Sequence, residues 1–183
     1  MHVVDDVAGV AFLGFLLFVV FEKSCRILLY NIDTLDILDV VINVIGLKDP
    51  HDIVVCRHNR QLYVVDCDCS IWRVSADDHS YVRWLPPSES TTDTQSVYAL
   101  SMWSRRLLLT SSEPPVVRQY STKINKIEVL CDVQLPQYMK SLSHAVETTR
   151  GTFVVCHRGT KHDEWQYAVS ELCEIDVCVN NVL

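Results

Sequence analysis

A strand-like apolar segment recurs in this chain at a constant spacing, and this repeat limits what the chain can fold into. The clearest copy, at residues 62–66, reads Leu-Tyr-Val-Val-Asp, and related segments begin at residues 17, 107 and 152. Successive copies are therefore 45 residues apart. Short apolar runs between polar turn residues indicate β-strands, because they lack the 3.6-residue periodicity of an amphipathic helix. The chain is predicted to contain four copies of one all-β unit.

The second copy defines the repeating unit most clearly. Polar turns separate four strand-like runs, at residues 51–56, 62–66, 71–75 and 81–85. Four strands in about forty residues are typical of one β-propeller blade. A lone blade has two apolar faces, so blades must pack face to face around an axis to bury them. We therefore predict an all-β propeller of four-stranded antiparallel blades, of which four are visible, at residues 7–45, 50–86, 96–134 and 142–180.

The uncharged run at residues 7–21 could instead be a membrane segment. It is shorter than the ~20 apolar residues that a spanning helix needs. Asp5 and Asp6 stand where a signal peptide would have basic residues, and no small-residue cleavage site follows. Because residue 17 is in phase with the repeat, we favour a strand pair that turns at Gly14 and is buried on both faces. A membrane anchor remains the alternative, and the lack of a convincing signal peptide gives a small preference for the cytoplasm.

Charge and cysteine content restrict the partners that we expect. The chain has 16 Lys and Arg against 23 Asp and Glu, a net charge of -7. Nucleic-acid binding needs a basic surface, so this balance argues against a nucleic-acid partner. Of eight cysteines, Cys56 and Cys156 lie within strand-like runs, where cysteine acts as a small buried hydrophobe, so we favour free thiols over disulfides. Cys67 and Cys69 lack a partner pair with zinc-site spacing.

The second unit also resembles a known blade type. Residues 50–55 read Pro-His-Asp-Ile-Val-Val and residues 71–74 read Ile-Trp-Arg-Val, on either side of the segment at 62–66. Together they resemble an NHL-type blade, and the third and fourth units match more loosely. The resemblance implies a propeller of the six-bladed NHL or TolB-like superfamily. With four blades visible, we expect residues 1–183 to form a single propeller domain or a fragment of one, and a partial six-bladed ring rather than a closed four-bladed ring.

Two histidines stand near the start of the predicted inner strands of alternate blades, His51 and His144. This arrangement resembles the peptidyl-amidoglycolate lyase domain, an NHL-related propeller that holds zinc with three such histidines. The resemblance implies a channel metal, zinc or calcium, bound by His51 and His144. A metal site needs a further ligand. We therefore favour a structural role, in which His51 bonds neighbouring backbone and His144 packs at a channel mouth, and we expect no cofactor.

A second polar cluster, His157, Arg158 and Lys161, lies on an enlarged turn of the fourth unit. It could bind an acidic or phosphorylated partner, although solvent-exposed loops carry such residues without any function. We expect a non-catalytic propeller module that binds a protein or small ligand through its loop face. The alternative is a metal-dependent propeller enzyme, amidoglycolate lyase-like or a lactonase-like hydrolase, whose divalent ion activates water or polarises a carbonyl.

Overall fold

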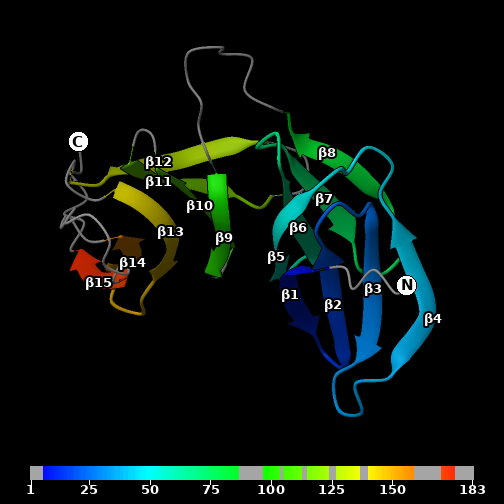
Figure 1. Cartoon of the computed structure of the whole chain (residues 1–183). Helices are drawn as coiled ribbons and strands as arrows, with labels where there is room; N and C mark the ends of the chain where they lie inside the picture. The colour runs from blue at the N-terminus through cyan, green and yellow to red at the C-terminus, as the bar shows by residue number, and fades with distance from the viewer. Residues whose placement is uncertain are drawn as a thin grey trace. The chain divides into compact units, whose positions relative to one another are not determined.

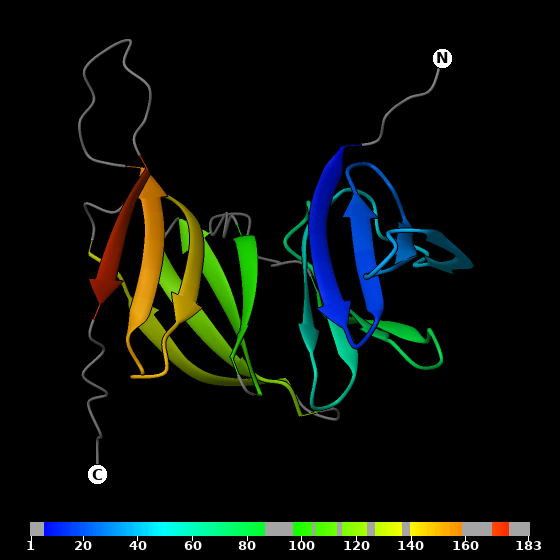
Figure 2. The same ribbon diagram turned by 90° about the horizontal axis from the view of Figure 1, so that it is seen from below.

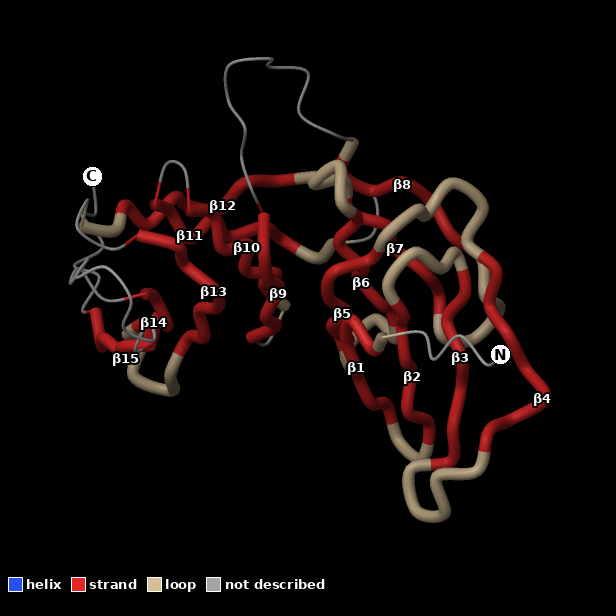
Figure 3. Tube along the Cα trace, viewed as in Figure 1, coloured by secondary structure: helices blue, strands red, loops and turns tan. Residues whose placement is uncertain are grey.

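The described part of the chain is built entirely of β-strands. A computed structural model describes residues 6–86, 97–103, 105–112, 115–123, 127–136, 140–158 and 170–175. These residues contain fifteen strands and no helix (Figure 3), so the all-β prediction is confirmed. The second strands of the four sheets begin at Leu16, Gln61, Arg106 and Phe153, in steps of 45, 45 and 47 residues. The 45-residue spacing seen in the sequence is therefore the spacing of the first three sheets, and the fourth sheet departs from it by two residues.

Each sheet is antiparallel, and its strands are neighbours in the order in which they occur in the chain (Figure 1). The first sheet comprises β1 (Val7–Leu13), β2 (Leu16–Phe21), β3 (Arg26–Asn31) and β4 (Ile37–Asn43). The second comprises β5 (Pro50–Cys56), β6 (Gln61–Asp66), β7 (Ile71–Ser75) and β8 (Tyr81–Leu85). The third comprises β9 (Val97–Trp103), β10 (Arg106–Ser112), β11 (Pro115–Ser121) and β12 (Glu128–Gln134). The fourth comprises β13 (Lys140–Glu147), β14 (Phe153–Arg158) and β15 (Ser170–Ile175).

The chain divides into two compact units. The first unit consists of Met1–Thr94 with Thr122–Ile127, and it contains the first and second sheets. The second unit consists of Gln95–Ser121 with Glu128–Leu183, and it contains the third and fourth sheets. The expectation of one propeller domain over the whole chain stays a prediction.

The core of the first unit lies between its two sheets. Phe18 of β2 belongs to the same buried cluster as Leu62 and Val64 of β6. The inner strands β1 and β5 approach closely at Gly9, where a Cβ atom would lie 2.9 Å from the backbone nitrogen of Ile53. Glycine is needed there because the obstructing atom belongs to the backbone and cannot rotate away. The two sheets therefore form one packed pair.

The N-terminal strand pair is confirmed, but only one of its faces is buried. β1 and β2 turn at Gly14, which has a φ of +62°, as predicted. Phe18 of β2 is fully buried, whereas Val10 and Phe12 of β1 are 56% and 47% exposed. The expectation that both faces are covered is therefore wrong for β1, since within this unit only the face toward β5 packs against a second sheet. No helix within the described residues is long and apolar enough to cross a membrane.

The second unit is organised in the same way. Leu108 and Val117 of the third sheet pack with Ala145 and Phe153 of the fourth in one buried cluster. The three strands of the fourth sheet lie side by side, coloured from gold to red in Figure 2. The register of β13 is irregular on both sides of Leu142, which is itself buried in the cluster. β13 begins at residue 140, two residues before the expected start of the fourth blade.

Candidate functional site

Four hairpin turns lie at one end of the sheets of the first unit. They are the turns β1–β2, β3–β4, β5–β6 and β7–β8. The backbone amide of Ile32 donates to the carbonyl of Phe15 (2.9 Å), which joins the β3–β4 turn to the β1–β2 turn. The amide of Ala76 donates to the carbonyl of Arg60 (3.0 Å), which joins the β7–β8 turn to the β5–β6 turn. The Arg60 side chain also pairs with Asp77, with 2.7 Å between Nε and Oδ1. These bonds hold the turns of each sheet together.

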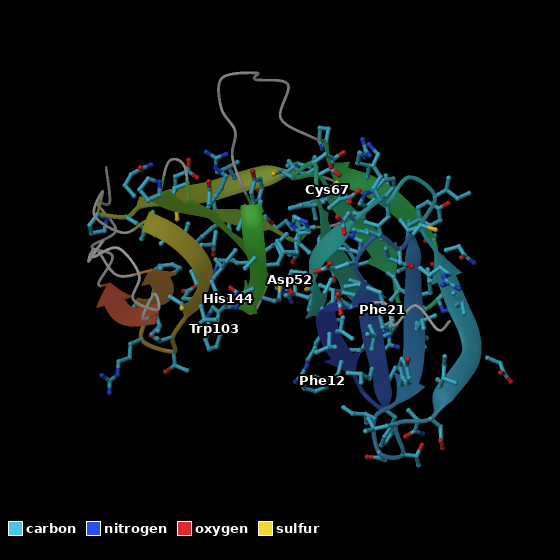
Figure 4. The ribbon with its side chains drawn as sticks, in the orientation of Figure 1. Phe12, Phe21, Asp52, Cys67, Trp103 and His144 are labelled. Carbon is cyan, nitrogen blue, oxygen red and sulfur yellow. The ribbon has the colours of Figure 1, made fainter. Side chains whose placement is uncertain are left out.

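Exposed apolar and basic side chains gather at this end of the first unit. Phe15 is 73% exposed and Leu35 is 64% exposed. The guanidinium carbon of Arg57, in the β5–β6 turn, lies 4.6 Å from the centroid of the Phe12 ring, a cation–π contact between the two sheets. Figure 4 labels Phe12 near the end of β1. We call Phe15, Leu35 and Arg57 the turn face; aromatic and arginine side chains are the residue types enriched at the energetic centres of protein interfaces.

The sequence reasoning did not identify the turn face. Turns usually carry glycine, proline or small polar residues, and Phe15 and Leu35 break that rule. Leu35 also has a φ of 58°, a left-handed conformation that bulky side chains rarely adopt. Large apolar residues at turn positions were therefore the signal that could have identified this face.

The opposite end of the first unit is organised around Asp66, the last residue of β6. Its fully buried carboxylate accepts hydrogen bonds from the amides of Lys48 (3.1 Å), Asp49 (2.8 Å) and Cys67 (2.9 Å). These bonds replace the water that the carboxylate loses on burial. Asp66 therefore joins the connection before β5 to the turn after β6, and its role is structural.

Cys67 and Asp68 follow this buried carboxylate. Desolvation, together with the charges of Asp66 and Asp68, raises the pKa of the Cys67 thiol. A raised pKa keeps the thiol protonated near neutral pH, which makes it a poor nucleophile and a poor metal ligand. None of Cys25, Cys56, Cys67, Cys69, Cys131 and Cys156 forms a disulfide bond with another described residue.

The two histidines predicted to bind a metal lie on inner strands, one in each unit. His51 is exposed and follows Pro50, which pairs with Asp66; His144 is exposed and pairs with Cys156 (Figure 4). Asp66 and Cys156 are two 45-residue repeats apart, so they occupy equivalent positions in their blades. His144 pairs with Cys156, and His51 is one residue from the partner of Asp66, so the positions of the two histidines in their blades agree within one residue. Among the described residues, no group of three or more His, Cys, Asp or Glu side chains is placed to hold a metal ion. Metal binding by this pair stays a prediction.

The residues predicted to bind a partner lie at or beyond the end of β14. Arg158 is the last residue of β14 and pairs with Ser170 of β15, while His157 precedes it in the same strand. Lys161 lies outside the described residues. Partner binding by these three residues stays a prediction.

A partly buried ion pair connects the two sheets of the second unit. Nη2 of Arg106, at the start of β10, lies 2.5 Å from Oε1 of Glu147, at the end of β13. The Glu147 side chain is buried, and Arg106 also donates to Gln119 (3.4 Å). The Ser101 hydroxyl adds a bond to the carbonyl of Ala145 (2.6 Å). Loss of Arg106 would leave the buried Glu147 carboxylate without a compensating charge. These contacts indicate a structural role.

Comparison with known proteins identifies the fold. No family model matches the chain, and no curated protein sequence matches it significantly. The β-propeller domain of Myceliophteria thermophila Cps50 (Swd1) is 10% identical, with a TM-score of 0.62 over 83% of this chain and 49% of that chain. A chain of the mitotic checkpoint complex is 11% identical, with a TM-score of 0.63 over 84% of this chain and 44% of that chain. The computationally designed Ika4 protein is 9% identical, with a TM-score of 0.62 over 96% of this chain and 94% of that chain.

The chain thus spans about half the length of the first two of these structures and nearly the whole length of the third. At such low identity the likeness shows the fold alone. The four described sheets have the antiparallel, sequential strand order of propeller blades. The chain has a β-propeller fold, as the sequence predicted.

Proposed function

We propose that this chain is a non-catalytic interaction module that binds a protein partner through the turn face of its first unit. The observation that carries the proposal is Phe15, an aromatic side chain that is 73% exposed at a turn. Exposing an aromatic ring to water is unfavourable, and aromatic residues dominate the energetics of protein interfaces. A packed pair of sheets holds this turn, so little conformational entropy is lost when a partner binds.

The residues of the turn face indicate what the binding surface of the partner contains. Phe15 and Leu35 would enter an apolar pocket, and Arg57 would pair with an acidic side chain beside it. One of the similar solved structures is a chain of the mitotic checkpoint complex, a protein assembly, and this supports a protein partner here. The net charge of -7 agrees with a protein rather than a nucleic acid as the partner.

The blade type remains part of the proposal. The motifs at residues 50–55, 62–66 and 71–74 favour an NHL-like propeller, and this assignment rests on the sequence motifs alone. Arg158, at the end of β14, and Lys161 are second candidates for partner binding, because basic residues suit an acidic or phosphorylated partner.

The test is recovery of partner proteins with purified wild-type and variant chains, quantified by mass spectrometry. We expect Phe15→Ser to abolish recovery of the specific partner and Arg57→Ala to reduce it. Ile45→Ser is the matched control, because Ile45 is an equally exposed apolar residue in the connection between β4 and β5. A partner recovered equally well with Phe15→Ser would exclude the turn face. Loss of recovery in an Arg158→Ala, Lys161→Ala double variant would assign binding to these two residues instead.

A metal-dependent propeller enzyme is the second candidate function. His51 and His144 favour it, because both are exposed on inner strands at nearly equal register. In such a site the ion would activate water or polarise a carbonyl. Metal analysis of the purified wild-type chain should then find a stoichiometric divalent ion that is lost in His51→Ala and His144→Ala. A metal content that is the same in wild-type and variant proteins would argue against this function.

A further inference from the structure

We propose that the second unit carries a separate binding surface for an acidic segment of a partner protein, built on Arg105 and Arg150. Arg105 lies in the turn between β9 and β10, and Arg150 lies in the turn between β13 and β14. Both side chains are exposed. We call these two residues the arginine site. It lies in the second unit, so the proposal does not depend on the turn face of the first unit.

A partly buried ion pair holds the two turns close together. Arg106, the first residue of β10, directly follows Arg105, and its guanidinium group pairs with Glu147, the last residue of β13. Arg150 is three residues further along the chain than Glu147. The turns that carry Arg105 and Arg150 are therefore neighbours at one end of the third and fourth sheets.

The β13–β14 turn holds the backbone of Arg150 in a defined position. The amide of Thr148 donates to the carbonyl of Thr152 (2.8 Å), which closes the turn. The amide of Arg150 donates to Oγ1 of Thr148 (3.3 Å), and Gly151, with a φ of +79°, reverses the chain directly after it. A backbone that is already ordered loses little conformational entropy when a ligand binds.

The repeat shows how the arginine site differs from the equivalent position in the first unit. Arg105 and Arg150 are 45 residues apart, and the residue one repeat before Arg105 is Arg60. Arg60 pairs with Asp77, with 2.7 Å between Nε and Oδ1. Within the described residues, no acidic side chain forms an ion pair with Arg150. The same repeat position thus carries a compensated charge in the first unit and, at Arg150, a charge that a partner can compensate.

Acidic residues are kept away from the two turns. The connections at residues 104–105 and 148–152 contain none. Glu147 is buried against Arg106. Glu128 and Glu174 lie on β12 and β15, the outermost described strands of the two sheets, whereas the arginine site lies beside the inner strands β9 and β13. The exposed charge at these two turns is therefore basic.

The chemistry of arginine indicates the ligand. A guanidinium group is planar and binds a carboxylate through two parallel hydrogen bonds, so two neighbouring arginines suit a segment that contains Asp or Glu. The net charge of -7 repels a long polyanion such as a nucleic acid more than a short acidic segment. Trp103, the half-buried last residue of β9 (labelled in Figure 4), pairs with Arg106 across the β9–β10 hairpin. Tryptophan and arginine are both enriched at the energetic centres of protein interfaces.

The test is fluorescence anisotropy of a labelled peptide of alternating Glu and Ser, titrated with the purified full chain. We expect it to bind more tightly than a control peptide of alternating Gln and Ser. Arg105→Ala and Arg150→Ala should each weaken binding about tenfold, because each removes a charge-assisted hydrogen bond. Arg150→Lys should give an intermediate loss, because lysine keeps the charge but cannot form two parallel bonds. Arg26→Ala is the matched control, since Arg26 is an exposed arginine on β3 of the first unit.

Two further comparisons separate this proposal from its rivals. Equal affinity for the two peptides, or binding that is unchanged in both Arg105→Ala and Arg150→Ala, would overturn the proposal. A single-stranded oligonucleotide of the same charge that bound more tightly than the Glu peptide would overturn it in favour of a nucleic-acid ligand. Phe15→Ser should leave peptide binding unchanged, so a failure here and a failure of the turn face are distinguishable. Circular dichroism spectra should show that all variants keep the β-sheet fold.

Discussion

Replacement of Gly46 by alanine should destabilise the first unit more than a turn glycine normally would. Gly46 has a φ of +102°, a conformation that side chains rarely adopt. A Cβ atom there would lie 2.9 Å from Cη2 and 3.1 Å from Cζ2 of Trp72. The Trp72 ring cannot easily withdraw, because it is buried in the core and the guanidinium carbon of Arg83 lies 4.9 Å from its centroid.

The two effects give the size of the expected loss. An unfavourable backbone conformation costs about 1–3 kcal/mol. Overpacking a filled core costs about another 1–3 kcal/mol. We therefore expect Gly46→Ala to lower the free energy of unfolding by about 2–6 kcal/mol, which is a large part of the 5–15 kcal/mol of a typical domain.

Urea denaturation followed by circular dichroism measures this loss, with Gly14→Ala as the matched control. Gly14 also has a positive φ, +62°, but nothing lies within 4 Å of the position of its Cβ atom. Gly14→Ala should lower the free energy of unfolding by about 1–2 kcal/mol, because only the unfavourable backbone conformation contributes there. In a double-mutant cycle, Trp72→Phe should reduce the cost of Gly46→Ala, because the smaller ring removes the contact. Equal costs for Gly46→Ala and Gly14→Ala, or no coupling to Trp72→Phe, would refute the packing argument.

Three further predictions concern the first unit. Asp66→Ala should lower the free energy of unfolding by about 2–4 kcal/mol, because three amides lose their acceptor, and chemical denaturation measures it. Burial raises the pKa of Tyr63 to about 12 from 10.0, so the stability that this phenol contributes is present below pH 10 and is lost as the pH rises to 12. Tyr63→Phe should remove that loss in denaturation curves compared below and above pH 10. His79 has a φ of 60°, so His79→Gly should raise the melting temperature slightly, and a lowered one would contradict the strain argument.

The strands were predictable because apolar runs and polar turns alternate clearly along the chain. The 45-residue step reproduces the starts of β2, β6 and β10, at Leu16, Gln61 and Arg106. The early start of β13 was not predictable, because irregular pairing on both sides of Leu142 extends the strand, and such irregularities leave no pattern in the sequence.

The packing environment was less predictable than the strands. An apolar face is equally apolar whether or not a sheet covers it, so the sequence could not show that Val10 and Phe12 are exposed. The turn face was missed for a similar reason. Phe15 was assigned to the apolar run at residues 7–21, whereas in the structure it lies in the turn between β1 and β2 and is exposed. The candidate site therefore followed from the geometry of the turns rather than from residue type.

The buried carboxylate of Asp66 also has a consequence for how the strands of the second sheet align. Residues 62–66 of β6 are all buried, so alternation of polar and apolar side chains does not fix which residue faces which side. A one-residue slip would exchange one apolar face for another at little hydrophobic cost. The slip would, however, move Asp66 away from the amides of Lys48 and Asp49 and leave these groups without an acceptor. In a sheet whose side chains give little information about alignment, one carboxylate selects the correct pairing of β5 with β6.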